Sequence, residues 1–150
     1  MSLADRLEAR GFTWAPQPHQ NPTHPILAAV RQGDVVCTSG QIPMEGDTPL
    51  IGKVSMGNIV EARRAAELCA VACLNAAGSV VGPDDIVGVI KLTVFVNGDR
   101  LFEQPTMIAN AASDLLIELF GEAGQHARSA VCVGTPLGAL VEIEATFRVR

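Results

Sequence analysis

Apolar residues recur every three or four positions along two long stretches of the chain, which predicts two amphipathic helices. The first stretch covers 58–77 and presents small apolar side chains on one face, with most of its charged side chains on the other. The second covers about 102–120. Because proline is tolerated in the first turn of a helix, its regular part is expected to begin near Pro105. Gly78 and Gly121 directly follow these stretches and are predicted to end the two helices.

Two longer stretches carry the patterns of strands within one sheet. Residues 86–96 are almost continuously apolar, as expected of an interior strand that is covered on one face by a helix. Residues 140–150 alternate between apolar and polar side chains, which indicates a strand with one buried face. The pattern therefore predicts an α+β fold, in which two long helices cover one face of a sheet and the other face needs a partner.

Shorter runs predict hairpins around the longer strands. The β-branched and apolar runs 26–31 and 34–39 lie on either side of a Gln-Gly pair, which is a hairpin signal. A strand at 129–134 is followed by a short turn and then by the last strand, so these two strands are expected to form a second hairpin. The segment 40–55 is predicted to be a loop, with a short strand near 50–51.

The N-terminal part has a different character. Residues 2–10 are predicted to form a short helix with Ser2 as its cap. The proline-rich segment 15–25 is expected to be an extended surface arm. A length of 150 residues suits one domain, so we expect a single domain over 1–150, with this helix and arm as its first part.

Composition and charge restrict the classes of function. Apolar residues make up 48% of the chain and mean hydropathy is +0.27, so surplus apolar surface points to oligomerisation. The net charge of −5 and the absence of a basic run argue against a nucleic-acid partner and against docking on acidic lipid. Because no apolar run is long enough to span a bilayer and no signal-peptide pattern is present, we expect a cytoplasmic protein without a membrane partner.

Cysteines and histidines give no pattern of a metal or redox site. Cys69 and Cys73 lie four residues apart in a helical pattern, lack the CxxC spacing, and are interpreted as buried small apolar residues. His19 and His24 are expected to be solvated residues of the arm. For His126 two roles stay open, at the end of the second helix or in the lining of a cleft. No cofactor motif occurs, and no cofactor or metal is expected.

Two side chains could carry chemistry. Arg128 stands at the start of a strand, and its planar guanidinium could hold a carboxylate through two hydrogen bonds; the alternative is an ordinary surface ion pair. Glu142 lies on the polar face of the last strand and could position or deprotonate water, or could simply face solvent. If the two strands pair, both residues would reach the mouth of one pocket.

Four motifs in this order resemble the signature of the YjgF/Rid family, also known as the endoribonuclease L-PSP family: TSGQIP at 38–43, KLTVFVNG at 91–98, ARSAV at 127–131 and VEIEA at 141–145. The resemblance covers the chain from about Ile26 to the C-terminus. The N-terminal helix and the long stretch 102–124 are similar to a divergent subgroup.

The resemblance implies a chorismate-mutase-like subunit, a homotrimer, and small-molecule clefts between the subunits. Members of the deaminase type hydrolyse enamine and imine intermediates of amino acids to 2-oxo acids and ammonia. By the same resemblance, Arg128 holds the substrate carboxylate and Glu142 acts on water. Ser39, Gly40 and Asn110 would line the cleft.

Two positions depart from the family pattern. Ile26 stands where the deaminases usually have Tyr, and Ala130 stands where a Cys is common, so a hydroxyl, a stacking surface and a thiol are lost. Three hypotheses follow. The first is an enamine or imine deaminase, in which burial raises the pKa of Glu142. The second is a non-catalytic sensor of a small carboxylate metabolite, which the missing Tyr favours. The third is a ribonuclease, against which the negative net charge argues.

Overall fold

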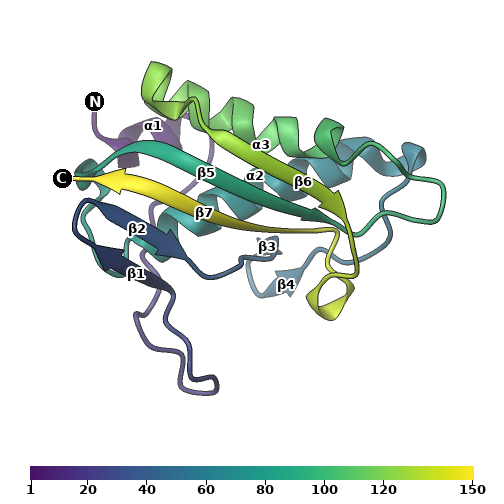
Figure 1. Ribbon diagram of the computed structural model, residues 1–150, viewed down its shortest axis with the longest axis horizontal. Helices are drawn as coiled ribbons and strands as arrows, with labels where there is room; N and C mark the ends of the chain where they lie inside the picture. Colours follow the sequence, from purple (N-terminus) through teal and green to yellow (C-terminus); the bar gives the residue numbers. More distant parts are fainter.

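The computed structural model describes residues 1–150 and has two layers, a mixed five-stranded sheet and helices packed on one of its faces (Figure 1). The strand order is β1-β2-β7-β5-β6. The strands of the sheet are β1 (Ala29–Gln32), β2 (Val35–Thr38), β5 (Ile86–Val96), β6 (Ala127–Cys132) and β7 (Val141–Val149). The helices are α1 (Leu3–Ala9), α2 (Ile59–Ala77) and α3 (Pro105–Phe120), and a separate small hairpin consists of β3 (Met44–Glu45) and β4 (Thr48–Pro49).

The two long helices form where the apolar spacing predicts them. α3 begins at Pro105, whose missing N–H costs nothing in the first turn of a helix. It ends at Gly121, whose φ of 64° is readily adopted by glycine because no Cβ opposes it. The buried faces of α2 and α3 consist mainly of alanine, leucine and cysteine, and the small alanine side chains let both helices lie close to the sheet.

The N-terminal helix and the arm also match their sequence patterns. Ser2 caps α1 through a reciprocal capping box with Asp5, in which each side chain accepts a hydrogen bond from the other residue's backbone N–H. The arm then runs back along the molecule and projects as a long loop before it enters β1 (Figure 1). The first hairpin is confirmed, with β1 starting at Ala29, three residues later than expected.

The predicted pairing of the last two strands is wrong. β5 lies between β6 and β7, because it pairs in parallel with β6 and antiparallel with β7. The connection over 133–140 is longer than the usual two to five residues of a hairpin loop. It is held instead by bonds to the segment after β4, from Gly52 N to Gly138 O (2.8 Å) and from Leu140 N to Leu50 O (2.9 Å). The connection therefore crosses the end of β5.

The core lies between the sheet and the helices. Val141, Ile143 and Phe147 of β7 point into it and are fully buried. Cys69 and Cys73 of α2 lie in the same core, which confirms their interpretation as small apolar residues. Burial raises the pKa of the Cys73 thiol to about 12, so this thiol stays protonated.

The other face of the sheet has no covering layer, and we call it the open face. Its strands present a mixture of apolar and charged side chains. Val30 of β1 is 51% exposed and Val131 of β6 is 42% exposed, although both are apolar. Lys91, Glu144 and Arg148 lie on the same face, and none of them forms a salt bridge within the chain. None of the helices combines the length and apolarity that a membrane crossing requires.

Candidate functional site

Glu142 projects from β7 on the open face and lies directly against Gly40. A Cβ atom at position 40 would overlap the Glu142 carboxylate, so glycine is the residue that leaves room for it. The strand-like segment at 39–41 is fixed beside β7 because Gln41 and Ile143 exchange two backbone hydrogen bonds, of 2.8 and 3.0 Å. Glu142 and Gly40 therefore come together as one site.

The environment of Glu142 disfavours its charged form. Partial burial raises the pKa of its carboxyl group, and the neighbouring Glu144 raises it further. The carboxylate accepts no hydrogen bond from the chain that would offset this effect. The expected upward shift is thus confirmed in direction. A carboxyl group of this kind exchanges a proton with bound water or substrate more readily than an ordinary surface glutamate does.

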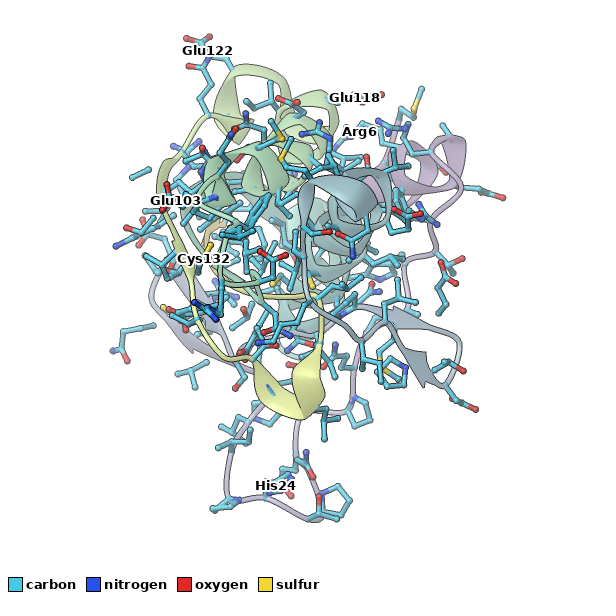
Figure 2. All side chains as sticks on the ribbon, turned by 90° about the vertical axis from the view of Figure 1, so that its right-hand side faces the viewer. Arg6, His24, Glu103, Glu118, Glu122 and Cys132 are labelled. Carbon is cyan, nitrogen blue, oxygen red and sulfur yellow. The ribbon has the colours of Figure 1, made fainter.

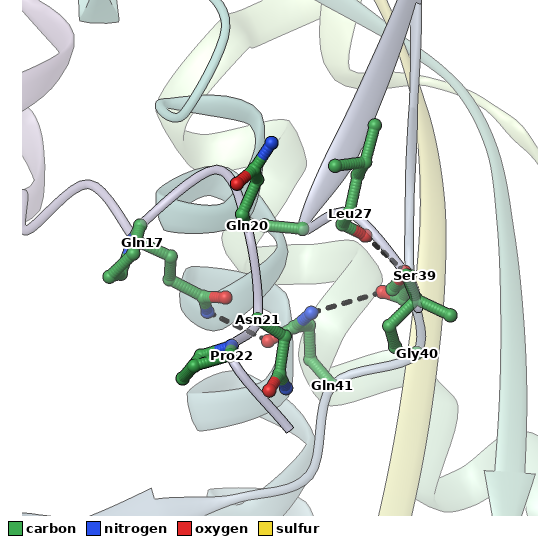
Figure 3. A pocket seen from close by; sticks show the side chains of 11 residues that line it. Gln17, Gln20, Asn21, Pro22, Leu27, Ser39, Gly40 and Gln41 are labelled. Atoms are coloured by element: carbon green, nitrogen blue, oxygen red, sulfur yellow. Dashed lines mark hydrogen bonds between the residues drawn. The ribbon is translucent and has the colours of Figure 1, made fainter. Parts of the chain in front are cut away.

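A cavity of about 330 Å³ adjoins this site (Figure 3). It lies between the arm and the segments 26–28 and 39–41. Ser39 forms part of its wall and donates a hydrogen bond from Oγ to the carbonyl oxygen of Leu27 (2.6 Å). Ile26 stands at its edge and is 52% exposed. Three residues that the sequence nominated, Ser39, Gly40 and Ile26, thus line the same cavity.

Arg128 lies on the other face of the sheet, toward α3. Its Nη1 atom donates to Asn110 Oδ1 (3.0 Å) and to Ser113 Oγ (2.9 Å), and both acceptors belong to α3. The structure thus brings Arg128 and Asn110 together, as the resemblance implied. The Nε and Nη2 atoms have no partner in the chain, so part of the guanidinium is free to bind an anion.

His126 extends the polar group around Arg128. Its Nδ1 atom lies 2.6 Å from the carbonyl oxygen of Gly124, so Nδ1 carries a proton in this bond. Its Nε2 atom lies 2.9 Å from Ser113 Oγ. In the neutral imidazole Nε2 accepts the Ser113 proton, which leaves the lone pairs of Oγ for Arg128. His126 therefore links the end of α3 to the start of β6 and orients Ser113.

Arg128 with its polar partners and Glu142 with Gly40 do not meet within one chain. Arg128 shares its face of the sheet with its neighbour Leu92, which is buried under the helices, whereas Glu142 is paired with Phe95 on the open face. β5 lies between the two strands that carry them. The expectation that a hairpin joins both residues at one pocket mouth is thus wrong for a single chain, because the strand pairing on which it depended does not occur.

The remaining residues considered in the sequence form no polar site. Ala130 lies on the same side of β6 as Arg128 and packs, half-buried, against the core. His19 and His24 are exposed, and Figure 2 shows His24 at the tip of the projecting arm. No group of three or more potential metal ligands occurs in the structure.

Three polar residues of the site were missed by the sequence reasoning. Ser113 follows Asn110 by three positions, so the helical period places both on one face of α3, and this signal could have found it. Gln41 belongs to the TSGQIP motif, of which only Ser39 and Gly40 were assigned a role. Gln17 of the arm donates a hydrogen bond to the side chain of Gln41 (2.7 Å), and no local sequence pattern predicts this long-range contact.

Comparison with known proteins identifies the relatives of this chain. A family model described as endoribonuclease L-PSP matches residues 18–149. The protein TCP17 of Trypanosoma cruzi is 36% identical over an alignment of 121 residues, and the match covers 73% of this chain and 76% of that protein.

Two solved structures extend the likeness to the fold. The protein Atu1372 of Agrobacterium tumefaciens, whose function is unknown, is 33% identical and superposes with a TM-score of 0.88, over 99% of this chain and 94% of its own. TdcF of E. coli, solved with bound serine, is 30% identical and has a TM-score of 0.57, over 91% and 94% of the two chains.

Proposed function

The chain belongs to the YjgF family, described also as endoribonuclease L-PSP, and from this premise we propose that it forms a homotrimer that hydrolyses enamine and imine intermediates of amino acids. The products are 2-oxo acids and ammonia. The substrate carboxylate binds Arg128 of one protomer, and Glu142 of the neighbouring protomer acts on water.

The observation that carries this proposal is the division of the site. Arg128 is positioned for an anion but has no carboxyl group beside it, whereas Glu142 has a raised pKa and no cation beside it. Because they lie on opposite faces of one sheet, a complete site needs a second chain. The open face, with its exposed valines and unpaired charges, is a surface on which a neighbour can pack.

The proposed chemistry balances with water as the only co-substrate. Arg128 holds the carboxylate of the imine and fixes its C=N group near Glu142. Glu142 accepts a proton from water as the oxygen bonds to the imine carbon and passes this proton to the nitrogen, which gives the carbinolamine. Glu142 then takes the proton of the carbinolamine hydroxyl and delivers it to the amino group, so that the C–N bond breaks with release of ammonia and the C=O bond of the 2-oxo acid forms. An enamine enters this sequence after tautomerisation to the imine.

One observation supports a second candidate, a sensor that binds the carboxylate without turnover. Ile26 stands at the edge of the cavity and brings neither a hydroxyl group nor an aromatic face. Serine bound to TdcF is consistent with binding of a small amino-acid-like carboxylate by a relative. Binding in this candidate requires Arg128 but not Glu142.

The two candidates are separated by one set of assays. Freshly generated 2-aminoacrylate and 2-iminobutanoate are supplied, and release of 2-oxo acid and ammonia is measured alongside the thermal shift caused by 2-oxobutanoate. For the deaminase, turnover in the wild type is lost in Arg128→Ala and falls at least about 100-fold in Glu142→Gln, whereas the exposed control Arg100→Ala keeps full activity. A thermal shift without turnover identifies a sensor, and the absence of both overturns the proposal.

A further inference from the structure

Five of the eleven residues that line the cavity beside Glu142 have polar side chains, and none of the eleven carries a charge. Four of its eleven lining residues are carboxamides, namely Gln17, Gln20, Asn21 and Gln41, and only three are hydrophobic. Ligand sites are usually lined mainly by apolar groups with a few polar ones. This cavity has a larger share of polar side chains than such sites, and its lining includes neither an acid nor a base.

The wall formed by the arm is fixed to the body of the protein. Asn75 at the C-terminal end of α2 accepts hydrogen bonds from Ala15 N through its side chain and from Gln17 N through its carbonyl oxygen, both of 2.9 Å. At the other end of the arm, Ala28 N donates to the carbonyl oxygen of His19 (3.1 Å). The arm is thus held at both ends, and the cavity has a defined shape.

Hydrogen bonds also fix the orientation of the two inner carboxamides (Figure 3). Gln17 Nε2 donates to Gln41 Oε1 (2.7 Å) and to the carbonyl oxygen of Ala72 (3.3 Å), which uses both of its N–H groups. Gln41 Nε2 donates one N–H to the carbonyl oxygen of Ser39 (3.1 Å). What stays free on these two side chains is therefore Gln17 Oε1 as an acceptor, the second N–H of Gln41 as a donor, and one lone pair of Gln41 Oε1.

From this pairing we propose that the cavity is a subsite for a carboxamide carried by the ligand. A primary amide has the N–H donor and the C=O acceptor that complement the free groups of Gln17 and Gln41. Gly40 lines the cavity and also lies against Glu142, so the subsite is continuous with the place where the proposed reaction occurs. The inference rests on the proposed function and names its substrate class: imino acids with a carboxamide in the side chain.

The same geometry disfavours other ligands. An aliphatic side chain would displace water from Gln17 Oε1 and the Gln41 N–H without replacing their hydrogen bonds. A second carboxylate would enter a cavity without a cation to balance it, next to the Glu142 carboxylate. Both should therefore bind more weakly than an amide of the same size.

Three isosteric 2-oxo acids test the inference by calorimetric titration: 2-oxosuccinamate, oxaloacetate and 4-methyl-2-oxopentanoate. We expect 2-oxosuccinamate to bind about tenfold more tightly than either of the others. The isosteric variant Gln17→Met should remove this preference, so that the three acids bind this variant with similar affinity. The control Gln125→Met, at an exposed position outside the cavity, should keep the preference.

The outcomes separate this inference from the proposed function. If all three acids bind the wild-type protein equally and binding is lost in Arg128→Ala, the carboxamide subsite is wrong and the proposed carboxylate site stands. If neither these three acids nor 2-oxobutanoate binds, both the carboxamide subsite and the proposed carboxylate site are wrong. Because the wild-type comparison alone decides the first case, the test does not depend on whether Gln17→Met folds.

Discussion

At the scale of single residues, Glu142 combines a raised pKa with an unpaired carboxylate, so its ionisation should oppose folding. A carboxyl group whose pKa is raised in the folded state favours folding most below its ordinary value of 4.5, and this contribution is lost as pH rises through the raised pKa. Replacement by the neutral isostere glutamine removes the cost of ionisation. Glu142→Gln should therefore unfold at a higher temperature than the wild type at pH 7, and the difference should vanish below pH 4.5.

The size of this effect is limited because Glu142 is partly exposed to solvent. The gain should stay below about 1 kcal/mol, or a few degrees in Tm. Thermal unfolding followed by circular dichroism from pH 4 to 8 measures it, with Glu122→Gln as the exposed control that should show no gain (Figure 2). A variant that loses stability at pH 7 would contradict the assignment of Glu142 as an unfavourably placed acid. Stability gained where activity is lost is typical of functional residues.

Some residues of the site could be predicted from the sequence and others could not. Arg128 and Glu142 were nominated from their residue types and positions and received their roles from the motif resemblance, which alone nominated Asn110. The upward pKa shift of Glu142 was predicted from expected burial. The contact between Gln17 and Gln41 could not be predicted, because it joins an irregular arm to a strand-like segment 24 positions away. Such contacts depend on how the arm folds back over the body, and no periodic pattern encodes that path.

At the scale of elements, α3 supplies the acceptors that hold Arg128. Ser113 is buried, accepts a hydrogen bond from Arg128 and bonds His126. Ser113→Ala removes one of the two hydrogen bonds of Arg128 and leaves His126 Nε2 without its partner, so it should destabilise the protein by about 1 to 3 kcal/mol. It should also weaken binding of 2-oxobutanoate, by about three- to tenfold, because the guanidinium then depends on Asn110 alone.

Thermal unfolding and a titration with 2-oxobutanoate measure these two effects. The exposed neighbour on α3, Asp114, offers a matched control as Asp114→Asn, which should change neither. If Ser113→Ala lowers stability but leaves the affinity at the wild-type value, Ser113 supports the fold without positioning Arg128.

The helices and strands themselves were largely predictable from the sequence, whereas the order of the strands in the sheet was not. The helical and alternating patterns report which face of each element is buried, and this placed α2, α3, β5 and β7 within a few residues. Strand order depends on contacts that are distant in sequence. The short turn expected at 135–138 suggested a hairpin, yet the two flanking patterns are equally compatible with an insertion of β7 between β2 and β5. That order gives the half-buried β7 a neighbour on each side.

At the scale of the whole molecule, the proposed trimer covers the open face and completes the clefts. Light scattering with size-exclusion chromatography should give three times the chain mass of 15.8 kDa. A charge placed on the open face, as in Val30→Asp, should yield lone protomers and abolish the binding of 2-oxobutanoate, because Arg128 and Glu142 no longer share a cleft. Val60→Asp, at a valine of α2 that is 78% exposed, should keep the trimer and the binding.

Thiol reactivity gives an independent measure of the same assembly. Cys69 and Cys73 should resist alkylation in every folded form, since both are buried and their pKa values are raised. Cys37 is exposed in the single chain and pairs with Val30 on the open face, so a neighbour packed there should protect it. Iodoacetamide labelling read by mass spectrometry should therefore show slow modification of Cys37 in the wild type and rapid modification in Val30→Asp. Equal labelling in both proteins, or a wild-type protein that is monomeric, would leave Arg128 and Glu142 on opposite faces of one sheet with no route to a shared substrate.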